Sequence, residues 1–445
     1  MTRFAAACLA ILPLIAALPA HAVTVRAVQG PTGVEAWLAE EHALPMIAFD
    51  ISLPAGSAYD PADKPGLASA TASLLDEGAG DLGADAFKEA LESKAIRFTA
   101  RAERDYLVVS LITLKDNADE AVRLAALAIG HPRFDAPALE RVRAELTAKL
   151  KQDEQNPTRV AVKSWFASWF GQHPYAHPPQ GTASGLAAIS SADLKNFAAA
   201  HFVRGGIKLA VAGDIPETQL KRYLQQLFLA LPANPVALAA RVAETGKPAT
   251  RTLLRNEAAP VAVFGMTGPM RSDADYIPVY VANQIIGGGT FSARLMDEVR
   301  DKRGLTYGIE THIEDFRSAS VLIGQVQSDK TKIQTAVDVT KSELTKFARD
   351  GATAKELADA KTYLTGSYPL TLDSNAKIAR TLGSYQRSGL SPDYVTRRNA
   401  MISAVTLDKV NQVAKKYFDP SHLMVVIAGT PAAPAKTANS ASGVK

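Results

Sequence analysis

The stretch GGGTFSARLMDEVRDKRGLTYG, residues 287–308, is the most informative part of this chain. It opens with three consecutive glycines: Gly287, Gly288 and Gly289. Glycines permit positive φ angles and close approach of the backbone to another group. The apolar spacing from 291 to 300 predicts an amphipathic helix that ends at Arg300, and Tyr307 follows seven positions later. The stretch therefore places a rigid guanidinium donor and a phenolic hydroxyl at a fixed spacing after a glycine loop.

The whole phrase resembles the substrate-holding segment in the C-terminal lobe of the pitrilysin/insulinase-type zinc peptidases, the processing-peptidase family. The resemblance implies that Arg300 and Tyr307 face a bound peptide and donate hydrogen bonds to its backbone carbonyl groups. It also implies a fold of two αβ lobes related by pseudo-symmetry.

Two other interpretations of this stretch exist. In one, Tyr307 packs on a sheet and Arg300 joins an exposed ion-pair group. The other charged members of that group are Asp297, Glu298, Asp301 and Arg303. In the second, the glycines cradle a phosphate, but the Lys-Ser/Thr pair of such a loop and a preceding strand are missing. The match over the entire phrase favours the peptide-holding interpretation, with Arg294 and Glu298 bracing the helix as an i,i+4 pair.

In that family the metal site is an inverted HxxEH motif in the N-terminal lobe, within a phrase such as GLAHxxEH. The corresponding phrase here is GLASATAS, residues 66–73. Ser69 and Ser73 stand at the two histidine positions, which share one face of a helix because they are four residues apart. Ala72 stands at the position of the glutamate that acts as general base. Neither serine replaces imidazole as a zinc ligand, and alanine accepts no proton.

The resemblance also implies a third ligand, a glutamate on a later helix that precedes an Asn/Asp-x-Pro turn. Counting back from Asn156-Pro157 places the equivalent position near Ala148 and Lys149. A lysine there repels a dication, and Glu145 lies about one helical turn too early. We therefore expect no catalytic residue and no metal in this chain, and zinc in a partner subunit.

The remaining histidines and nearby glutamates give no replacement metal site in the sequence. His173 and His177 are four residues apart, but three prolines around them exclude a regular helix. Five further histidines are isolated and are expected at the surface or in satisfied core positions: His42, His131, His201, His312 and His422. We interpret Glu77 and Glu92 as solvated surface residues.

An internal repeat supports two lobes. Residues Ser191–Asp214 align without a gap on Leu407–Thr430 at a constant offset of 216, and each copy reads as a helix, a turn and an apolar strand that ends in glycine. Each half also opens with a strand, at 46–53 and 261–266, followed by a helix, another helix, a pair of strands and two more helical stretches. This order predicts an α+β fold with mostly antiparallel sheets covered by helices. The resemblance implies the same fold, two pseudo-symmetric, insulinase-like αβ lobes.

The sequence predicts five segments. Residues 1–22 are a signal peptide, 23–230 the N-terminal lobe with the degenerate zinc site, and 251–430 the C-terminal lobe with Arg300 and Tyr307. Residues 231–250 hold three prolines among alanines, a composition typical of a linker. Residues 431–445 are small and polar, which predicts a disordered tail.

The first residues indicate export to the periplasm. Arg3 precedes an apolar run from Phe4 to Leu18, and Ala20-His21-Ala22 predicts cleavage after Ala22. The run is shorter than the ~20 residues of a membrane span, and no other run is long enough, so we expect no span. The only cysteine, Cys8, lies in this segment, so the mature chain has neither disulfides nor thiolate ligands. The charge of +4 is spread along the chain, which argues against a nucleic-acid partner.

These features predict a non-catalytic, substrate-binding subunit of a periplasmic insulinase-type zinc peptidase, inactive alone and contributing to metalloendopeptidase activity in a heterodimer. Its expected partners are a catalytic subunit with an intact HxxEH motif and an extended peptide that adds as a strand to an exposed sheet edge. Two alternatives stay open. One is a stand-alone, chaperone-like homodimer that binds peptides, and the other is an active metallopeptidase with a displaced metal site.

Overall fold

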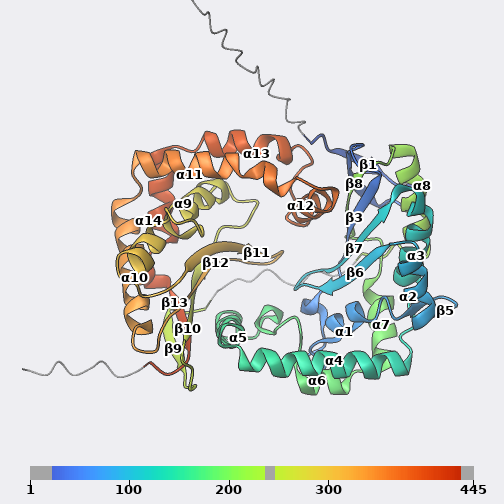
Figure 1. Ribbon diagram of the computed structural model, residues 1–445, viewed down its shortest axis with the longest axis horizontal. Coiled ribbons are helices and arrows are strands. Elements are labelled where there is room, and N and C mark those ends of the chain that lie inside the picture. The colour runs from blue at the N-terminus through green and yellow to red at the C-terminus, as the bar shows by residue number, and fades with distance from the viewer. Residues whose placement is uncertain (1–22, 236–245, 432–445) are drawn as a thin grey trace, which may run out of the picture.

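The computed structural model describes residues 23–235 and 246–431. The predicted signal peptide, residues 236–245 of the predicted linker and all but the first residue of the predicted tail lie outside the described residues. Two lobes lie side by side along the long axis of the molecule, each with a sheet and surrounding helices (Figure 1).

The two lobes have one main sheet each. The strands of the N-terminal lobe sheet are β1 (Arg26–Gln29), β2 (Glu35–Glu40), β3 (Met46–Leu53), β6 (Arg97–Ala102), β7 (Leu107–Leu114) and β8 (Lys208–Gly213). Those of the C-terminal lobe are β9 (Ala249–Leu253), β10 (Val261–Thr267), β11 (Ile309–Asp315), β12 (Ser320–Gln327) and β13 (Met424–Ala428). A separate pair is formed by β4 (Gly78–Ala79) and β5 (Leu82–Gly83). Ala249 and Thr250, at the end of the predicted linker, are the first residues of β9.

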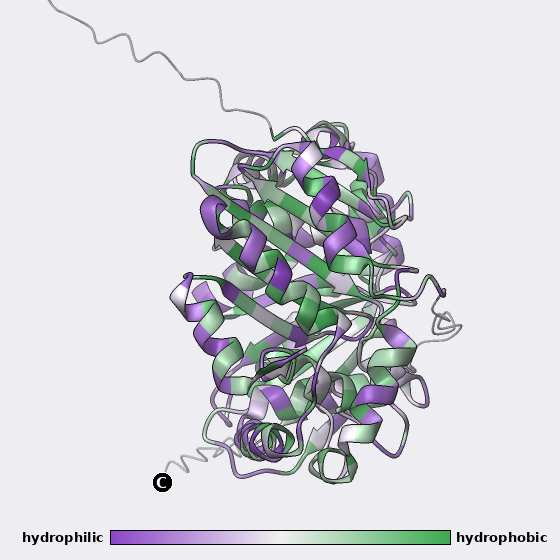
Figure 2. Cartoon of the chain, turned by 90° about the vertical axis from the view of Figure 1, so that its right-hand side faces the viewer, coloured by the Kyte–Doolittle hydropathy of each residue, from purple (hydrophilic) through white to green (hydrophobic). Residues whose placement is uncertain are grey.

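Helices cover both sheets. In the N-terminal half they are α1 (Leu67–Ser73), α2 (Ala84–Ser93), α3 (Ala118–Gly130), α4 (Ala136–Gln155), α5 (Pro157–Phe170), α6 (Ala183–Ala188), α7 (Ser191–His201) and α8 (Glu217–Phe228). In the C-terminal half they are α9 (Tyr276–Gly287), α10 (Ile333–Asp350), α11 (Ala354–Gly366), α12 (Asn375–Arg387), α13 (Tyr394–Ser403) and α14 (Leu407–Tyr417). Helices near the surface carry hydrophilic and hydrophobic residues along their length, as expected for amphipathic helices (Figure 2).

The sheets confirm the predicted α+β class. The strand order is β1-β2-β8-β3-β7-β6 in one sheet and β11-β12-β10-β13-β9 in the other. All neighbouring strands are antiparallel except β2 with β8 and β9 with β13. The single parallel pair occupies the same place in each lobe, as pseudo-symmetry requires.

The repeated sequence occupies equivalent positions in the two lobes. One copy forms α7 and β8, and the other forms α14 and β13. Each copy ends in a glycine with positive φ, +138° at Gly213 and +129° at Gly429. A Cβ atom at Gly213 would lie 2.1 Å from the carbonyl oxygen of Met46, and one at Gly429 would lie 2.6 Å from Cβ of Pro260. Both the backbone conformation and the close neighbour therefore require glycine.

The lobes exchange helices. α5, from the N-terminal half, packs on β10 and β13 of the C-terminal sheet, whereas α12 packs on β3 and β8 of the N-terminal sheet. Alternation along β3 explains the second contact: Ile47, Phe49 and Ile51 belong to the apolar core of the N-terminal lobe, and Asp50 points to α12, where it binds Arg387 at 2.8 Å. The exchange joins the lobes through two helices, each of which packs on the sheet of the other lobe.

The tips of two hairpins add a polar contact between the lobes. The hydroxyl of Tyr175 donates to Asp105 at 2.5 Å, and the backbone N–H of Arg317 donates to the other oxygen of that carboxylate at 2.9 Å. Arg104 lies 3.8 Å above the ring of Phe166. Because these residues come from both halves, the relative position of the lobes is fixed by packing and hydrogen bonds together.

Candidate functional site

The phrase that corresponds to the metal-binding motif of the resembled family, GLASATAS, contains α1, a short helix next to α4. Ala72 is buried, and Ser69 and Ser73 are partly exposed on one face, as their four-residue spacing predicts. Lys149 and Glu145 are exposed on α4. Among residues 23–235 and 246–431, no three His, Cys, Asp or Glu side chains are grouped so that they could hold a metal ion.

Asp60 holds the start of α1. Its two carboxylate oxygens accept hydrogen bonds from the backbone N–H groups of Gly66, at 2.7 Å, and Ala68, at 2.8 Å. Gly66 adopts a φ of +106°, which turns the chain into the helix. Burial raises the pKa of Asp60 to about 7, although these hydrogen bonds oppose the shift. The carboxyl group therefore releases its proton near neutral pH in the folded protein and near pH 4 in the unfolded chain.

We expect Asp60 to make the protein more stable as the pH falls from 8 to 5. Because its pKa is raised by folding, the folded state binds a proton that the unfolded chain lacks, and this contribution disappears as the pH rises through about 7. Denaturant unfolding at several pH values measures this effect. The free energy of unfolding of wild type, minus that of Asp60→Asn, should rise on acidification by at most about 1.4 kcal/mol per pH unit. Identical pH dependence of the two proteins would contradict this role of Asp60.

The prediction that Glu77 is a solvated surface residue is wrong. Its side chain is buried, and it binds Lys88 at 2.7 Å and also Arg141 on α4. Burial alone would raise the pKa of Glu77, but the hydrogen bonds from the two cations outweigh it and lower the pKa. Glu77 is therefore an ionised group that ties α4 to the segment after α1. Glu92 is exposed, as expected.

His173, the first histidine of the predicted pair, orders a loop. His173 caps a short 3-10 helix, Pro174–Ala176, where its Nδ1 accepts from the backbone N–H of Tyr175 at 3.2 Å. Its ring also lies 4.4 Å from the ring of Tyr175. The first histidine thus orders the loop around the buried Tyr175.

The glycine loop of the C-terminal lobe has the geometry that its composition predicts. A Cβ atom at Gly287 would lie 2.3 Å from Oγ1 of Thr311, and one at Gly288 would lie 2.4 Å from Oε1 of Gln284. Gly289 has a φ of +75°. The loop therefore lets the end of α9 contact β11 closely before the chain turns.

The predicted helix after the loop is shorter and has a different form. Regular helix begins at Arg294, and Met296–Asp301 is a π-helix, a form found frequently at functional sites. The predicted pair between Arg294 and Glu298 is wrong. Arg294 binds Glu356 of α11 at 2.5 Å, and Glu298 binds Lys302 at 2.5 Å and also Arg303. A partner distant in the sequence thus replaces the local one.

Arg300 and Tyr307 lie in different surroundings. Arg300 binds Asp301 at 2.5 Å, and its guanidinium lies 4.9 Å from the ring centre of Phe291. This ion pair agrees with one part of the alternative interpretation, in which Arg300 joins an exposed ion-pair group. The other part is wrong, because the side chain of Tyr307 is 100% exposed and does not pack on the sheet. A fully exposed tyrosine leaves its hydroxyl accessible to a ligand.

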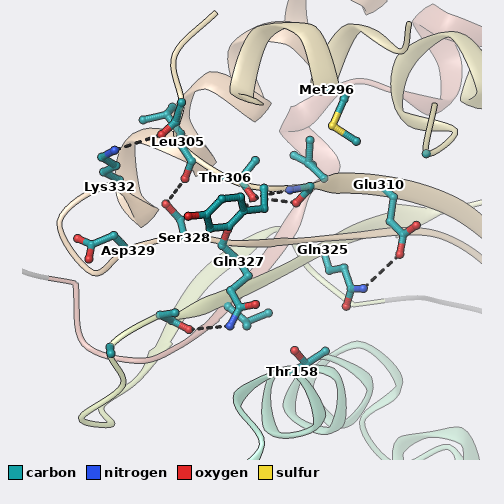
Figure 3. A pocket seen from close by; sticks show the side chains of 18 residues that line it. Thr158, Met296, Leu305, Thr306, Glu310, Gln325, Gln327, Ser328, Asp329 and Lys332 are labelled. Atoms are coloured by element: carbon teal, nitrogen blue, oxygen red, sulfur yellow. Dashed lines mark hydrogen bonds between the residues drawn. The ribbon is translucent and has the colours of Figure 1, made fainter. Parts of the chain in front are cut away.

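The loop that carries Tyr307 is held by its neighbours (Figure 3). Oγ1 of Thr306 donates to the carbonyl oxygen of Gln327 at 2.7 Å, and Ser328 donates to the carbonyl oxygen of Leu305. Lys332 donates to the carbonyl oxygen of Gly304 at 3.1 Å. The exposed ring of Tyr307 therefore projects from an ordered backbone.

Tyr307 lines a cavity of about 850 Å³. Gly289 also lines it, whereas Arg300, Gly287 and Gly288 are not among its lining residues. Figure 3 shows Thr158, in the first turn of α5, across the cavity from Gln325 and Gln327 of β12. The structure thus brings together Tyr307, one glycine and polar residues that the sequence argument missed.

Two sequence signals could have found those residues. Gln325 and Gln327 alternate on β12 and are therefore on one face of the strand. Asn156, the N-cap of α5, accepts from the backbone N–H of Thr158 at 2.9 Å, and Pro157 occupies the first position of the helix. The Asn-Pro pair thus predicts where α5 begins, but it does not predict which cavity or sheet the helix lies against.

Fold and site together define an α+β protein of two lobes, in which the described residues include no group of His, Cys, Asp or Glu side chains that could hold a metal ion. Residues 39–182 match the family model described as insulinase, peptidase family M16, and residues 188–364 match the model described as the peptidase M16 inactive domain. The chain belongs to the insulinase (peptidase M16) family, which confirms the resemblance.

The chain is similar over most of its length both to a relative described as a non-peptidase and to one described as a zinc protease. It is 26% identical to a non-peptidase homolog, YmxG, of Helicobacter pylori, over 87% of this chain and 90% of the relative. It is 22% identical to an uncharacterized zinc protease, also YmxG, of Bacillus subtilis, over 89% of this chain and 96% of the relative. The crystal structure of a peptidase M16 inactive domain from Pseudomonas fluorescens has a TM-score of 0.88 at 29% identity, covering 93% of this chain and 99% of that one.

None of the helices in the described part of the chain is long and apolar enough to cross a membrane.

Proposed function

We propose that this chain is a non-catalytic, peptide-binding subunit of a periplasmic zinc peptidase, and that it forms a heterodimer with an insulinase-family subunit that carries HxxEH. One observation supports this most directly. The two-lobed fold is complete, yet Ser69, Ala72 and Ser73 stand where the resemblance places two zinc ligands and the general base. Without imidazole or carboxylate at these positions, the chain lacks the means to hold zinc and activate water there.

The accessible donors of the C-terminal lobe support a peptide-binding role. Tyr307 is fully exposed on an ordered loop beside a cavity, and Arg300 carries a guanidinium group with several N–H donors. A phenolic hydroxyl and a guanidinium can both donate hydrogen bonds to the carbonyl oxygens of a peptide. In the proposed heterodimer these two side chains orient the peptide, and the zinc of the partner subunit supplies the activated water.

β6 is the edge to which an extended peptide would add. It is one of the two outer strands of the N-terminal lobe sheet, the other being β1, and its backbone pairs on one side with β7. β11, one of the two outer strands of the other sheet, is partly blocked because the carbonyl oxygen of Thr311 accepts from Nδ2 of Asn283 at 2.9 Å. Strand addition uses backbone groups of the peptide, so the expected sequence selectivity is modest.

Complex formation tests this proposal. We expect this chain, affinity-tagged and exported together with an HxxEH-bearing family member from the same genome, to co-purify as a heterodimer of defined mass in light scattering. The complex should cleave an unfolded peptide, and the chain alone should not. Recovery of only free monomers would contradict the proposal, and a homodimer that binds peptides without a partner would support the chaperone-like alternative instead.

A further inference from the structure

A second cavity, of about 410 Å³, lies among α9, α12 and α13 and is separate from the Tyr307 cavity in its lining. Five arginines line it: Arg101, Arg271, Arg380, Arg387 and Arg398. Five tyrosines also line it: Tyr276, Tyr280, Tyr368, Tyr385 and Tyr394. The remaining lining residues are threonine and serine, so no carboxylate faces this cavity among the described residues. Walls of this composition present hydrogen-bond donors and aromatic faces together.

Only two of the five arginines have carboxylate partners in the described part of the chain. Arg387 binds Asp50 at 2.8 Å, and Arg101 binds Glu103 at 2.8 Å. Arg380 is exposed on α12 and forms no ion pair with any residue that the structure describes. The lining of this cavity therefore has an excess of positive charge, which attracts anions, whereas carboxylates line the adjoining cavity that shares Arg271 and Arg387 with it.

Arg398 is a buried cation without a counter-ion in the described residues. Its side chain is 6% exposed, and its donors reach only neutral acceptors: the carbonyl oxygen of Leu364 at 3.1 Å, Asn399 at 2.9 Å and the hydroxyl of Tyr280 at 3.1 Å. Its guanidinium also lies 4.3 Å from the ring centre of Tyr368. The cost of burying a guanidinium falls when an anion binds beside it.

Arg271 adds a donor that lacks an acceptor. Its Nη1 donates to the hydroxyl of Tyr276 at 2.7 Å, but its Nε is buried without a hydrogen-bond partner. The nearest acid, Asp315, accepts from the backbone N–H of Arg271 at 3.2 Å and lines the neighbouring cavity instead. Buried polar groups in proteins are nearly always paired, so a guanidinium with an unpaired N–H is incompletely satisfied, and Arg271 belongs to the lining of this cavity.

The tyrosines contribute rings and protonated hydroxyls. The guanidinium of Arg271 lies 4.6 Å from the ring centre of Tyr276 and 5.2 Å from that of Tyr385. Burial raises the pKa of Tyr276 to about 12 and that of Tyr385 above its usual range, so both phenols stay protonated. They add no negative charge that would neutralise the arginines.

We propose that this arginine–tyrosine cavity binds a small ligand through an oxyanion group, either a carboxylate or a phosphate. The guanidinium groups of Arg271, Arg380 and Arg398 supply the charge and the donors, and the tyrosine rings contact the body of the ligand. A cavity of this size accommodates a ligand of about the size of an amino acid or a simple phosphate ester. This site is independent of the proposed heterodimer and uses neither Arg300 nor Tyr307.

Calorimetric titration of the full chain tests the proposal with three probes: inorganic phosphate, N-acetylphenylalanine and its uncharged amide. We expect saturable binding of phosphate or of N-acetylphenylalanine, but not of the amide, and the anion that binds identifies the source of the oxyanion. Arg380→Gln and Arg271→Gln should each weaken binding at least about tenfold, because each removes a charged hydrogen-bond donor.

Arg397→Gln is the matched control, since Arg397 neighbours Arg398 on α13, binds Asp393 and does not line the cavity. It removes the same net charge and should change affinity by less than about twofold. Because Arg380 is exposed, its variant keeps the fold, which circular dichroism can check. Absence of binding of both anions up to about 10 mM, or equal weakening by Arg397→Gln, would overturn the proposal.

Discussion

Replacing Arg300 with alanine and Tyr307 with phenylalanine together should lower kcat/KM of the reconstituted heterodimer by about 100-fold. A hydrogen bond from a charged donor contributes about 1.5–3 kcal/mol, and one from a neutral hydroxyl about 0.5–1.5 kcal/mol. If both donors act on the peptide during cleavage, their loss acts on the transition state as well as on binding. The measurement is steady-state hydrolysis of a fluorogenic peptide by the purified pair.

The stability of the double variant should stay within about 0.5 kcal/mol of wild type, because Tyr307 is fully exposed and the ion pair of Arg300 is solvent-accessible. Two residues provide matched controls. Arg303 is exposed in the same segment and binds Glu298, and Tyr363 is half-exposed on α11. Arg303→Ala with Tyr363→Phe should leave kcat/KM nearly unchanged. Unchanged kinetics in the Arg300/Tyr307 variant would reduce that pair to a structural role.

Trp165→Ala should lower the free energy of unfolding by about 3–5 kcal/mol. Trp165 is fully buried on α5, stacks on Trp169 with ring centres 5.0 Å apart, and donates to the carbonyl oxygen of Met424 at 3.1 Å. A Cβ atom on Gly265 would lie 2.7 Å from its ring, so this sheet position has no side chain that could fill the space left by the indole. The substitution therefore removes apolar burial, opens a cavity and leaves a carbonyl group without its donor.

Denaturant unfolding of the full chain measures this effect, with Lys163→Ala as the control. Lys163 is exposed on the same helix, so its loss should change stability by less than about 0.5 kcal/mol. A loss of less than about 1 kcal/mol for Trp165→Ala would show that α5 contributes little to the joining of the lobes.

The repeat explains why the fold was largely predictable. Positions 216 residues apart share a helix, a strand and a glycine, and the glycines at 213 and 429 prove to be sterically required. The pair of strands that the sequence predicts in each half, at residues 96–114 and 306–327, corresponds to β6–β7 and β11–β12. Alternation and turn residues are local signals, and they were sufficient for these elements.

Helix number and helix packing were not predictable to the same extent. Two helical stretches were expected before the final strand of each half, but the structure has five in each: α3–α7 and α10–α14, within the described ranges. Breaks such as Asn156-Pro157 divide what reads as one helical pattern. The exchange of α5 and α12 between lobes was not foreseen, because an apolar helix face does not specify which sheet it covers.

The site shows the same limit. The positions of Tyr307 and of the glycine loop followed from motif and spacing, whereas Arg294 binds Glu356, which is 62 residues away, and Glu77 binds Arg141, which is 64 residues away. Such long-range partners depend on the tertiary structure. The arginine–tyrosine cavity likewise gathers residues from β6, α9, α12 and α13, so no local motif identifies it.

The zinc content of the purified proteins tests most directly whether this chain depends on a partner for its metal. Elemental analysis by mass spectrometry should give no zinc for this chain alone and about one zinc per heterodimer. Replacing the HxxEH histidines of the partner should remove both the zinc and the peptidase activity. Stoichiometric zinc in this chain alone, together with peptide cleavage that a chelator abolishes, would contradict the account.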